Sequence, residues 1–192
     1  MQADYLVELG RDDETLEFPW AGPEGGPRYY DLKRCPENLT QIEEAVRFPE
    51  LREFLARVNA PGGALETAKC DAWASNEMNP EEEIFGAPWK FGSYVDLISS
   101  DESSRYSFDD HERLLKKLTG LLQRVPEIPA AAELLLRRCF FHGGNDVREG
   151  FYVTFYLLGY GQDGTKARQQ WAIALKLASN AITQLYFRNA SL

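Results

Sequence analysis

Apolar and polar side chains alternate most regularly between residues 151 and 160. One set of alternate positions is apolar and consists of Phe151, Val153, Phe155 and Leu157. The other set combines hydroxyl-bearing side chains with one leucine, namely Tyr152, Thr154, Tyr156, Leu158 and Tyr160. Because the side chains of a strand point alternately to its two faces, this pattern predicts a strand with one dry and one semi-polar face. Such a strand is typical of an antiparallel sheet.

Residues 63–192 show one order of patterns twice, in which two strand-like segments are followed by a helix. The predicted strands are 65–76, 89–99, 131–142 and 150–160, and the predicted helices are 108–124 and 165–187. Ser107, followed three positions on by Asp110, is typical of a helix start. Residues 131–138 fit either a helix or a strand, because their alanines and leucines favour a helix and the following Cys-Phe-Phe favours a strand. The repeated order indicates a duplicated ββα unit.

Residues 1–62 are expected to form short strands followed by helices. Strand-like composition occurs over residues 5–9, 15–20 and 28–32, and the Gly- and Pro-rich stretch 21–27 predicts an exposed loop. Pro36 fits the first turn of a helix. Pro49 pushes Phe48 out of helical geometry before a second helix begins. The turn at residues 59–63 ends this segment.

Together these patterns predict an α+β fold with an antiparallel sheet of at least four strands. Two helices cover one face of the sheet in a ββα-ββα core, and the N-terminal strand and helix segment covers an edge or the other face. A chain of 192 residues is long enough for one well-packed core. We therefore expect a single domain over 1–192, with an N-terminal segment 1–62 and a duplicated core 63–192.

The charge balance narrows the expected partners. A formal net charge of −9 disfavours nucleic acids and anionic membranes, which need a cationic field on the protein. No stretch approaches the ~20 apolar residues that span a bilayer, and no secretory signal is visible at the N-terminus. The cysteines Cys35, Cys70 and Cys139 form no CxxC pair, which favours reduced thiols in a cytoplasmic protein.

Candidate binding residues emerge when the predicted strands are sorted by parity. If the sheet is continuous, its semi-polar face gathers one tryptophan, three tyrosines, two lysines, two aspartates and a threonine, including Lys69, Asp71 and Thr154. The residues that we predict to bind a ligand or partner are Trp73, Lys90, Tyr94, Asp96, Tyr152 and Tyr156. Tyrosine and tryptophan offer wide apolar contact with a hydrogen-bonding tip, which suits a recognition surface. The alternative is that these side chains pack against the N-terminal helices.

Catalytic and metal-binding chemistry has weaker support. The two histidines, His111 and His142, are far apart and fit no two-histidine ligand spacing. Cys139 and His142 point to opposite faces of a regular strand, so they do not form a nucleophile pair there. The sequence therefore predicts no metal site and no cofactor. Residues 79–91 form a long aromatic insertion that either covers a pocket beneath Ile84 to Phe91 or anchors itself to the core through Phe85 and Trp89.

Two functions follow from these observations. The first is a non-catalytic module that binds a small ligand or a partner protein through the aromatic sheet face. The second is an enzyme that uses scattered carboxylates with His111 or His142, which requires those groups to meet in one cleft. Because Tyr152, Tyr156 and Tyr160 share one side of a strand, a homodimer through that side is a separate prediction.

Overall fold

The computed structural model describes residues 1–24, 26, 28–125, 127–144 and 146–189, with the side chains of all of these except 83, 84 and 186–189. The described chain has an α+β fold built on one six-stranded mixed sheet that is mostly antiparallel. Its strands are β1 (Gln2–Val7), β2 (Thr15–Phe18), β3 (Leu65–Ser75), β4 (Trp89–Ser99), β5 (Ala130–Gly143) and β6 (Asp146–Gly161). The strand order is β1-β5-β6-β4-β3, and β2 also pairs with β5.

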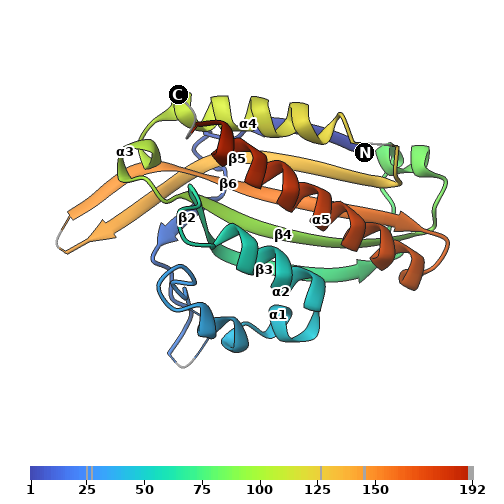
Figure 1. Ribbon diagram of the computed structural model, residues 1–192, viewed down its shortest axis with the longest axis horizontal. Helices are drawn as coiled ribbons and strands as arrows, with labels where there is room; N and C mark the ends of the chain where they lie inside the picture. The colour runs from blue at the N-terminus through green and yellow to red at the C-terminus, as the bar shows by residue number, and fades with distance from the viewer. Residues whose placement is uncertain (25, 27, 126, 145, 190–192) are drawn as a thin grey trace.

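The helices fall between the strands and after them. The α-helices are α1 (Glu43–Arg47), α2 (Pro49–Val58), α3 (Glu102–Arg105), α4 (Phe108–Leu122) and α5 (Gly164–Asn189), and the 3-10 helices are η1 (Pro36–Gln41) and η2 (Pro80–Phe85). Figure 1 shows α5 running across the sheet in front of β6 and β4, with α4 above it and α2 below it. We call the side of the sheet that α2, α4 and α5 cover the helix face.

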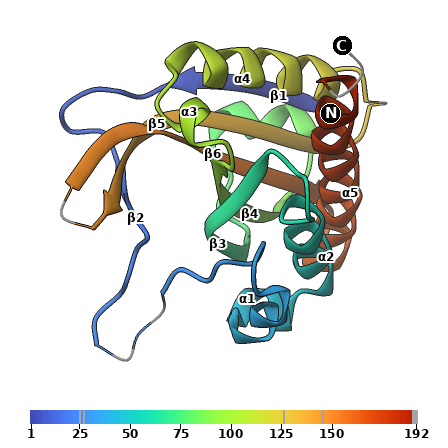
Figure 2. The same cartoon turned by 60° about the vertical axis from the view of Figure 1, so that its left-hand side comes forward.

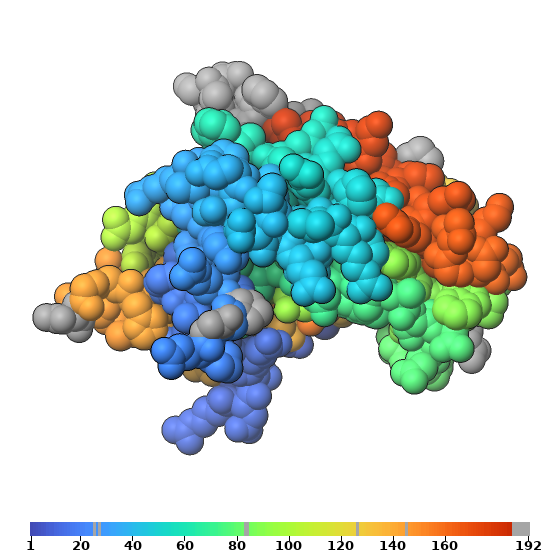
Figure 3. Space-filling view, turned by 90° about the horizontal axis from the view of Figure 1, so that it is seen from below, coloured from blue at the N-terminus to red at the C-terminus, as the bar shows by residue number. Residues whose placement is uncertain are grey.

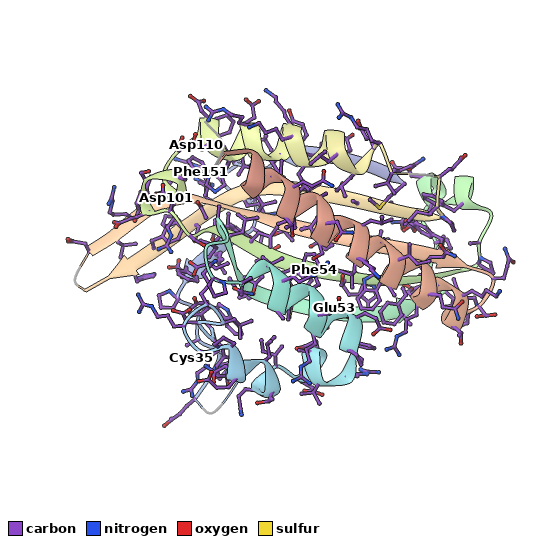
Figure 4. The ribbon with its side chains drawn as sticks, in the orientation of Figure 1. Cys35, Glu53, Phe54, Asp101, Asp110 and Phe151 are labelled. Atoms are coloured by element: carbon purple, nitrogen blue, oxygen red, sulfur yellow. The ribbon has the colours of Figure 1, made fainter. Side chains whose placement is uncertain are left out.

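The main core lies between the sheet and these three helices. The apolar positions predicted for the strand at 150–160 do point into it, and Val153 and Phe155 are each 1% exposed. From the helices, Trp171 of α5 and Leu118 of α4 belong to this core, and both are almost completely buried. Phe54 of α2 is 2% exposed, whereas its neighbour Glu53 points to solvent, as Figure 4 shows. The 3.6-residue periodicity of each helix thus fixes which side it buries.

Close contact between α5 and the sheet depends on a glycine of β6. A methyl group built at Gly159 would lie 2.1 Å from the backbone nitrogen of Trp171 and 2.6 Å from the backbone oxygen of Ala167. Both atoms belong to the helix backbone, which cannot move aside as a flexible side chain can. Gly159 therefore sets how closely α5 approaches β6.

The N-terminal segment joins the sheet in a way that the sequence did not predict. β3, β4, β6 and β5 pair antiparallel as predicted, but β1 and β2 both pair with β5 in parallel, so the sheet is mixed. The predicted strand at residues 28–32 is wrong, since the described part of this stretch contributes only an isolated bridge between Ala21 and Arg28. Figure 3 shows the blue N-terminal chain and the helical segment after it packed together on the side seen from below.

Several local predictions are confirmed. The ambiguous residues 131–138 are part of β5, a central strand between β1 and β6. Ser107 caps α4, because its hydroxyl accepts a hydrogen bond from the backbone nitrogen of Asp110. Phe48 is extended, with φ −123° and ψ 95°, and separates α1 from α2 as Pro49 requires.

Among the helices described here, none has both the length and the apolar composition to cross a lipid bilayer.

Candidate functional site

The other side of the sheet, which we call the open face, carries a row of side chains that runs across five strands. Strand register places Asp71 of β3 opposite Tyr94 of β4, Tyr94 opposite Tyr156 of β6, Tyr156 opposite Glu133 of β5, and Glu133 opposite Asp4 of β1. We call these five residues the tyrosine row. The three carboxylates are exposed and the two tyrosines are half-buried. Figure 2 shows α5 and α2 to the right of the sheet, whereas β2 and the chain segments before and after it lie to the left.

The two tyrosines at the centre of the row form one aromatic pair. Their ring centroids are 5.9 Å apart and the rings are tilted by 50°. Partial burial raises the pKa of the Tyr94 phenol, and the neighbouring Asp96 and Asp71 raise it further. Both the burial and the surrounding negative charge therefore keep this hydroxyl protonated and able to donate a hydrogen bond.

Trp73 extends this aromatic surface along the sheet. It lies opposite Gly92 of β4, and Gly92 lies opposite Leu158 of β6. A methyl group built at Gly92 would lie 3.0 Å from two ring atoms of Trp73 and 2.7 Å from a methyl carbon of Leu158. The missing side chain at Gly92 therefore gives the Trp73 ring its place against the sheet beside the tyrosine pair.

A buried carboxyl group lies in the next row of the open face. Asp96 is 5% exposed, and its Oδ1 accepts a 2.8 Å hydrogen bond from the Thr154 hydroxyl. That hydroxyl accepts in turn from a guanidinium nitrogen of Arg137 at 3.3 Å. Burial raises the pKa of Asp96 to about 7, because desolvation outweighs the hydrogen bond from Thr154 and the attraction of Lys69 and Arg137. Asp96 therefore changes charge near neutral pH.

Arg137 joins this network to the N-terminal chain. Its guanidinium group donates to Glu8 at 2.7 Å and to Glu14 at 2.8 Å. Its side chain is 10% exposed, so the two ion pairs hold the segment between β1 and β2 over this part of the sheet. The positive charge of Arg137 is thereby neutralised within the protein.

Each end of the open face is covered by a different segment of the chain. At one end, Leu16 and Phe18 of β2 pack with Tyr152, which is 1% exposed, in a second apolar cluster. At the other end, Phe85 of η2 stacks on Tyr160 with ring centroids 4.0 Å apart.

The η2 end is also fixed by polar contacts. The Tyr160 hydroxyl donates to one oxygen of Glu82 at 3.0 Å, and Lys90 donates to the other oxygen at 2.7 Å. This carboxylate also accepts from the backbone nitrogen of Asn79, so the insertion at 79–91 is anchored through Phe85 and Glu82. The side chain of Ile84 lies outside the described part, and Trp89 is 36% exposed.

The six predicted binding residues all belong to the open face, but they differ in accessibility. Tyr94, Tyr156 and Trp73 are partly exposed, whereas Tyr152 and Asp96 are buried and Lys90 is ion-paired with Glu82. The line of Tyr152, Tyr156 and Tyr160 on β6 therefore offers one accessible ring, that of Tyr156.

The three carboxylates of the tyrosine row are not among the six residues predicted to bind. Parity places Asp71 on the polar face of its predicted strand without distinguishing it from the other polar residues there. Glu133 was hidden by the ambiguity between helix and strand at 131–138, and Asp4 by the unpredicted pairing of β1. The signal that finds them is strand register, which a single sequence supplies only after the pairing is known.

The histidines and cysteines lie elsewhere. His111 is 3% exposed and its Nδ1 is 2.9 Å from the backbone oxygen of Ser107, and burial lowers its pKa. It borders a hollow of about 280 Å³ whose one carboxylate, Asp110, is ion-paired with Arg113. His142, on the β5–β6 hairpin, is hydrogen-bonded to Glu17 of β2. Cys139 is buried, and its opposite orientation to the exposed His142 matches the strand prediction.

The larger hollows of the described chain are lined by residues outside the tyrosine row. The hollow of about 570 Å³ lies at β3 between Trp73, Phe48, Phe91 and Arg168. The hollow of about 340 Å³ also borders the edge strand β3 and is lined by Trp20, Tyr30, Lys69 and Cys70, among others. In the part of the chain that the structure describes, no group of three or more His, Cys, Asp or Glu side chains is placed to hold a metal ion.

Comparisons of the chain with protein-family models, with curated proteins and with solved structures gave no match. Function is therefore inferred from the open face and its chemistry.

Proposed function

We propose that this protein is a non-catalytic interaction module that binds a partner protein through the tyrosine row. The observation that carries the proposal is the alignment of Tyr94 and Tyr156 as half-exposed neighbours on the sheet face opposite α2, α4 and α5. Tyrosines on a rigid sheet supply a large contact area at low cost in side-chain entropy. Such side chains are enriched at protein interfaces.

The shape of the surface favours a protein over a small molecule as the partner. A small ligand is usually held in a concave site that buries most of its surface. The tyrosine row instead lies open between the covered ends of the face, and none of its five residues lines the hollows of about 570, 340 and 280 Å³. An open surface that crosses five strands fits a partner that is itself extended or broad.

Three further proposals concern the location of the protein, its internal duplication and its self-association. The free thiols of Cys35, Cys70 and Cys139 support a reducing, cytoplasmic location. The element order β3–β4–α4 and β5–β6–α5 supports a duplicated ββα unit within a single domain. A homodimer through the same face is a further outcome that the test below distinguishes.

Hydroxyl-radical footprinting tests the proposed surface without knowledge of the partner. In the purified chain we expect radicals to oxidise Tyr94 and Tyr156, whereas the buried Tyr152 and Tyr160 are spared. In the host cell, oxidation of Tyr94 and Tyr156 falls while that of Tyr5, a partly buried tyrosine packed on the main core, stays the same.

Two results would change the picture. Equal oxidation of Tyr94 and Tyr156 in the purified protein and in the cell would contradict the proposal. Protection in the purified protein that disappears on dilution, together with a dimer mass by light scattering, would identify the partner as a second copy of the chain.

A further inference from the structure

We infer that the partner presents a basic segment, whose lysine or arginine side chains lie over the Tyr94 and Tyr156 rings between the carboxylates of the row. This inference rests on the proposed function and specifies the chemistry of the partner. The row reads carboxylate, tyrosine, tyrosine, carboxylate, carboxylate from β3 to β1, with no basic side chain in it.

The spacing of the row suits a cation. Neighbouring strands lie about 4.8 Å apart, so each tyrosine has a carboxylate one strand away on its outer side, Asp71 beside Tyr94 and Glu133 beside Tyr156. A lysine or arginine head group within about 6 Å of a ring centroid is attracted by the electrons of the ring. The same head group can then reach the neighbouring carboxylate, which adds a charge-assisted hydrogen bond.

The charges around the row also favour a basic partner, because the nearby basic side chains already have partners within the protein. Arg137 is neutralised by Glu8 and Glu14, and Lys90 by Glu82. Lys69 lies over the Trp20 ring, with its ammonium group 5.1 Å from the ring centroid. Partial burial raises the pKa of Glu133, and repulsion from Glu8, Asp4 and Glu81 raises it further against the attraction of Arg137.

Other occupants fit the row less well. Nucleic acids and anionic lipid surfaces carry the same sign of charge as the exposed carboxylates. A second copy of the chain, placed face to face, would bring the carboxylates of one row close to those of the other. Like charges at an interface oppose association, whereas a basic segment is complementary in charge to the row.

A hexa-arginine peptide is a suitable probe, with binding to the full chain followed by fluorescence anisotropy at about 0.15 M salt. Because the protein carries a net charge of −9, general attraction of the peptide needs a matched control. The double variant Asp71→Asn/Glu133→Gln removes two charges from the row. The control, Asp109→Asn/Glu53→Gln, likewise neutralises one aspartate and one glutamate, but at exposed positions on α4 and α2 outside the row.

We expect the row variant to bind the peptide at least about fivefold more weakly than the control variant, which is the ratio for ~1 kcal/mol. A second pair of variants isolates the aromatic contribution. Tyr94→Leu/Tyr156→Leu weakens binding by a similar factor, whereas Tyr94→Phe/Tyr156→Phe, which keeps both rings, retains it. Circular dichroism of each variant checks that the fold is kept.

Two outcomes overturn the inference. Equal weakening by the row and control variants would mean that the peptide responds to net charge alone. An unchanged affinity in the leucine variant would remove the rings from the contact. Either result leaves the proposed function standing if footprinting still shows protection of Tyr94 and Tyr156 in the cell, since that test requires no charge on the partner.

Discussion

The buried carboxyl group of Asp96 makes a specific prediction about the pH dependence of stability. Its pKa is raised from an ordinary 3.8 to about 7, chiefly by desolvation. An acid whose pKa is raised by folding stabilises the native state fully below its unfolded pKa and loses that contribution as pH rises through the folded pKa. The contribution of Asp96 is therefore present near pH 4 and lost by about pH 7.

The magnitude follows from the size of the shift. A difference of about three pKa units corresponds to about 4 kcal/mol between the two protonation states, at 1.36 kcal/mol per unit. Asp96→Asn removes the titrating group and keeps an oxygen that can accept the hydrogen bond from Thr154. The variant should therefore lack this part of the pH dependence.

Urea unfolding followed by tryptophan fluorescence, at several pH values from 4.5 to 8, measures the effect. The stability of the variant relative to the wild type should rise by about 3 kcal/mol over this range, because part of the total is already lost below pH 4.5. Other titrating groups cancel in the difference because both proteins contain them. Two curves of unfolding free energy that run parallel across the range would refute the reasoning, since Asp96 would then titrate alike in the folded and unfolded chains.

Three further substitutions test the packing on the two sides of the sheet. Gly92→Ala forces a methyl group against Trp73, so it should lower the free energy of unfolding in urea by about 1–3 kcal/mol and shift the tryptophan emission. An unchanged emission spectrum would contradict the position of the Trp73 ring against Gly92. The methyl group of Gly159→Ala would clash with the backbone at Trp171, so this variant should be less stable than Gly92→Ala. Equal urea midpoints for the two variants would contradict this. Leu118→Ala, at a position 1% exposed, should cost about 2–5 kcal/mol, and a loss below about 1 kcal/mol would mean that α4 is not packed on the core.

Strong local periodicity made much of the fold predictable. The strand around 151–160 and the helices at 108–124 and 165–187 have regular apolar spacing, and all three are present. Residues 131–138 were ambiguous because alanine and leucine favour a helix in isolation. Their central position between β1 and β6 makes them a strand, and alternate residues such as Leu134 and Leu136 are fully buried against the helices.

Non-local pairing was the main feature that the sequence did not reveal. β1 and β2 are short and pair in parallel with a strand more than a hundred residues away, and no local pattern encodes that choice. The same gap affected the site. Parity placed Tyr94 and Tyr156 on one face, but their accessibility depends on which segments cover the face, and only distant β2 and η2 decide that Tyr152 and Tyr160 are buried.

Photo-cross-linking from the tyrosine row tests the central claim most directly. A photoreactive phenylalanine analogue placed at Tyr156 is compared in the host cell with the same analogue at Ile173, which is 46% exposed on α5. We predict adducts with one distinct partner protein from position 156 and none from position 173. Adducts that form from position 173 but not from position 156 would contradict the assignment of the open face as the interaction surface.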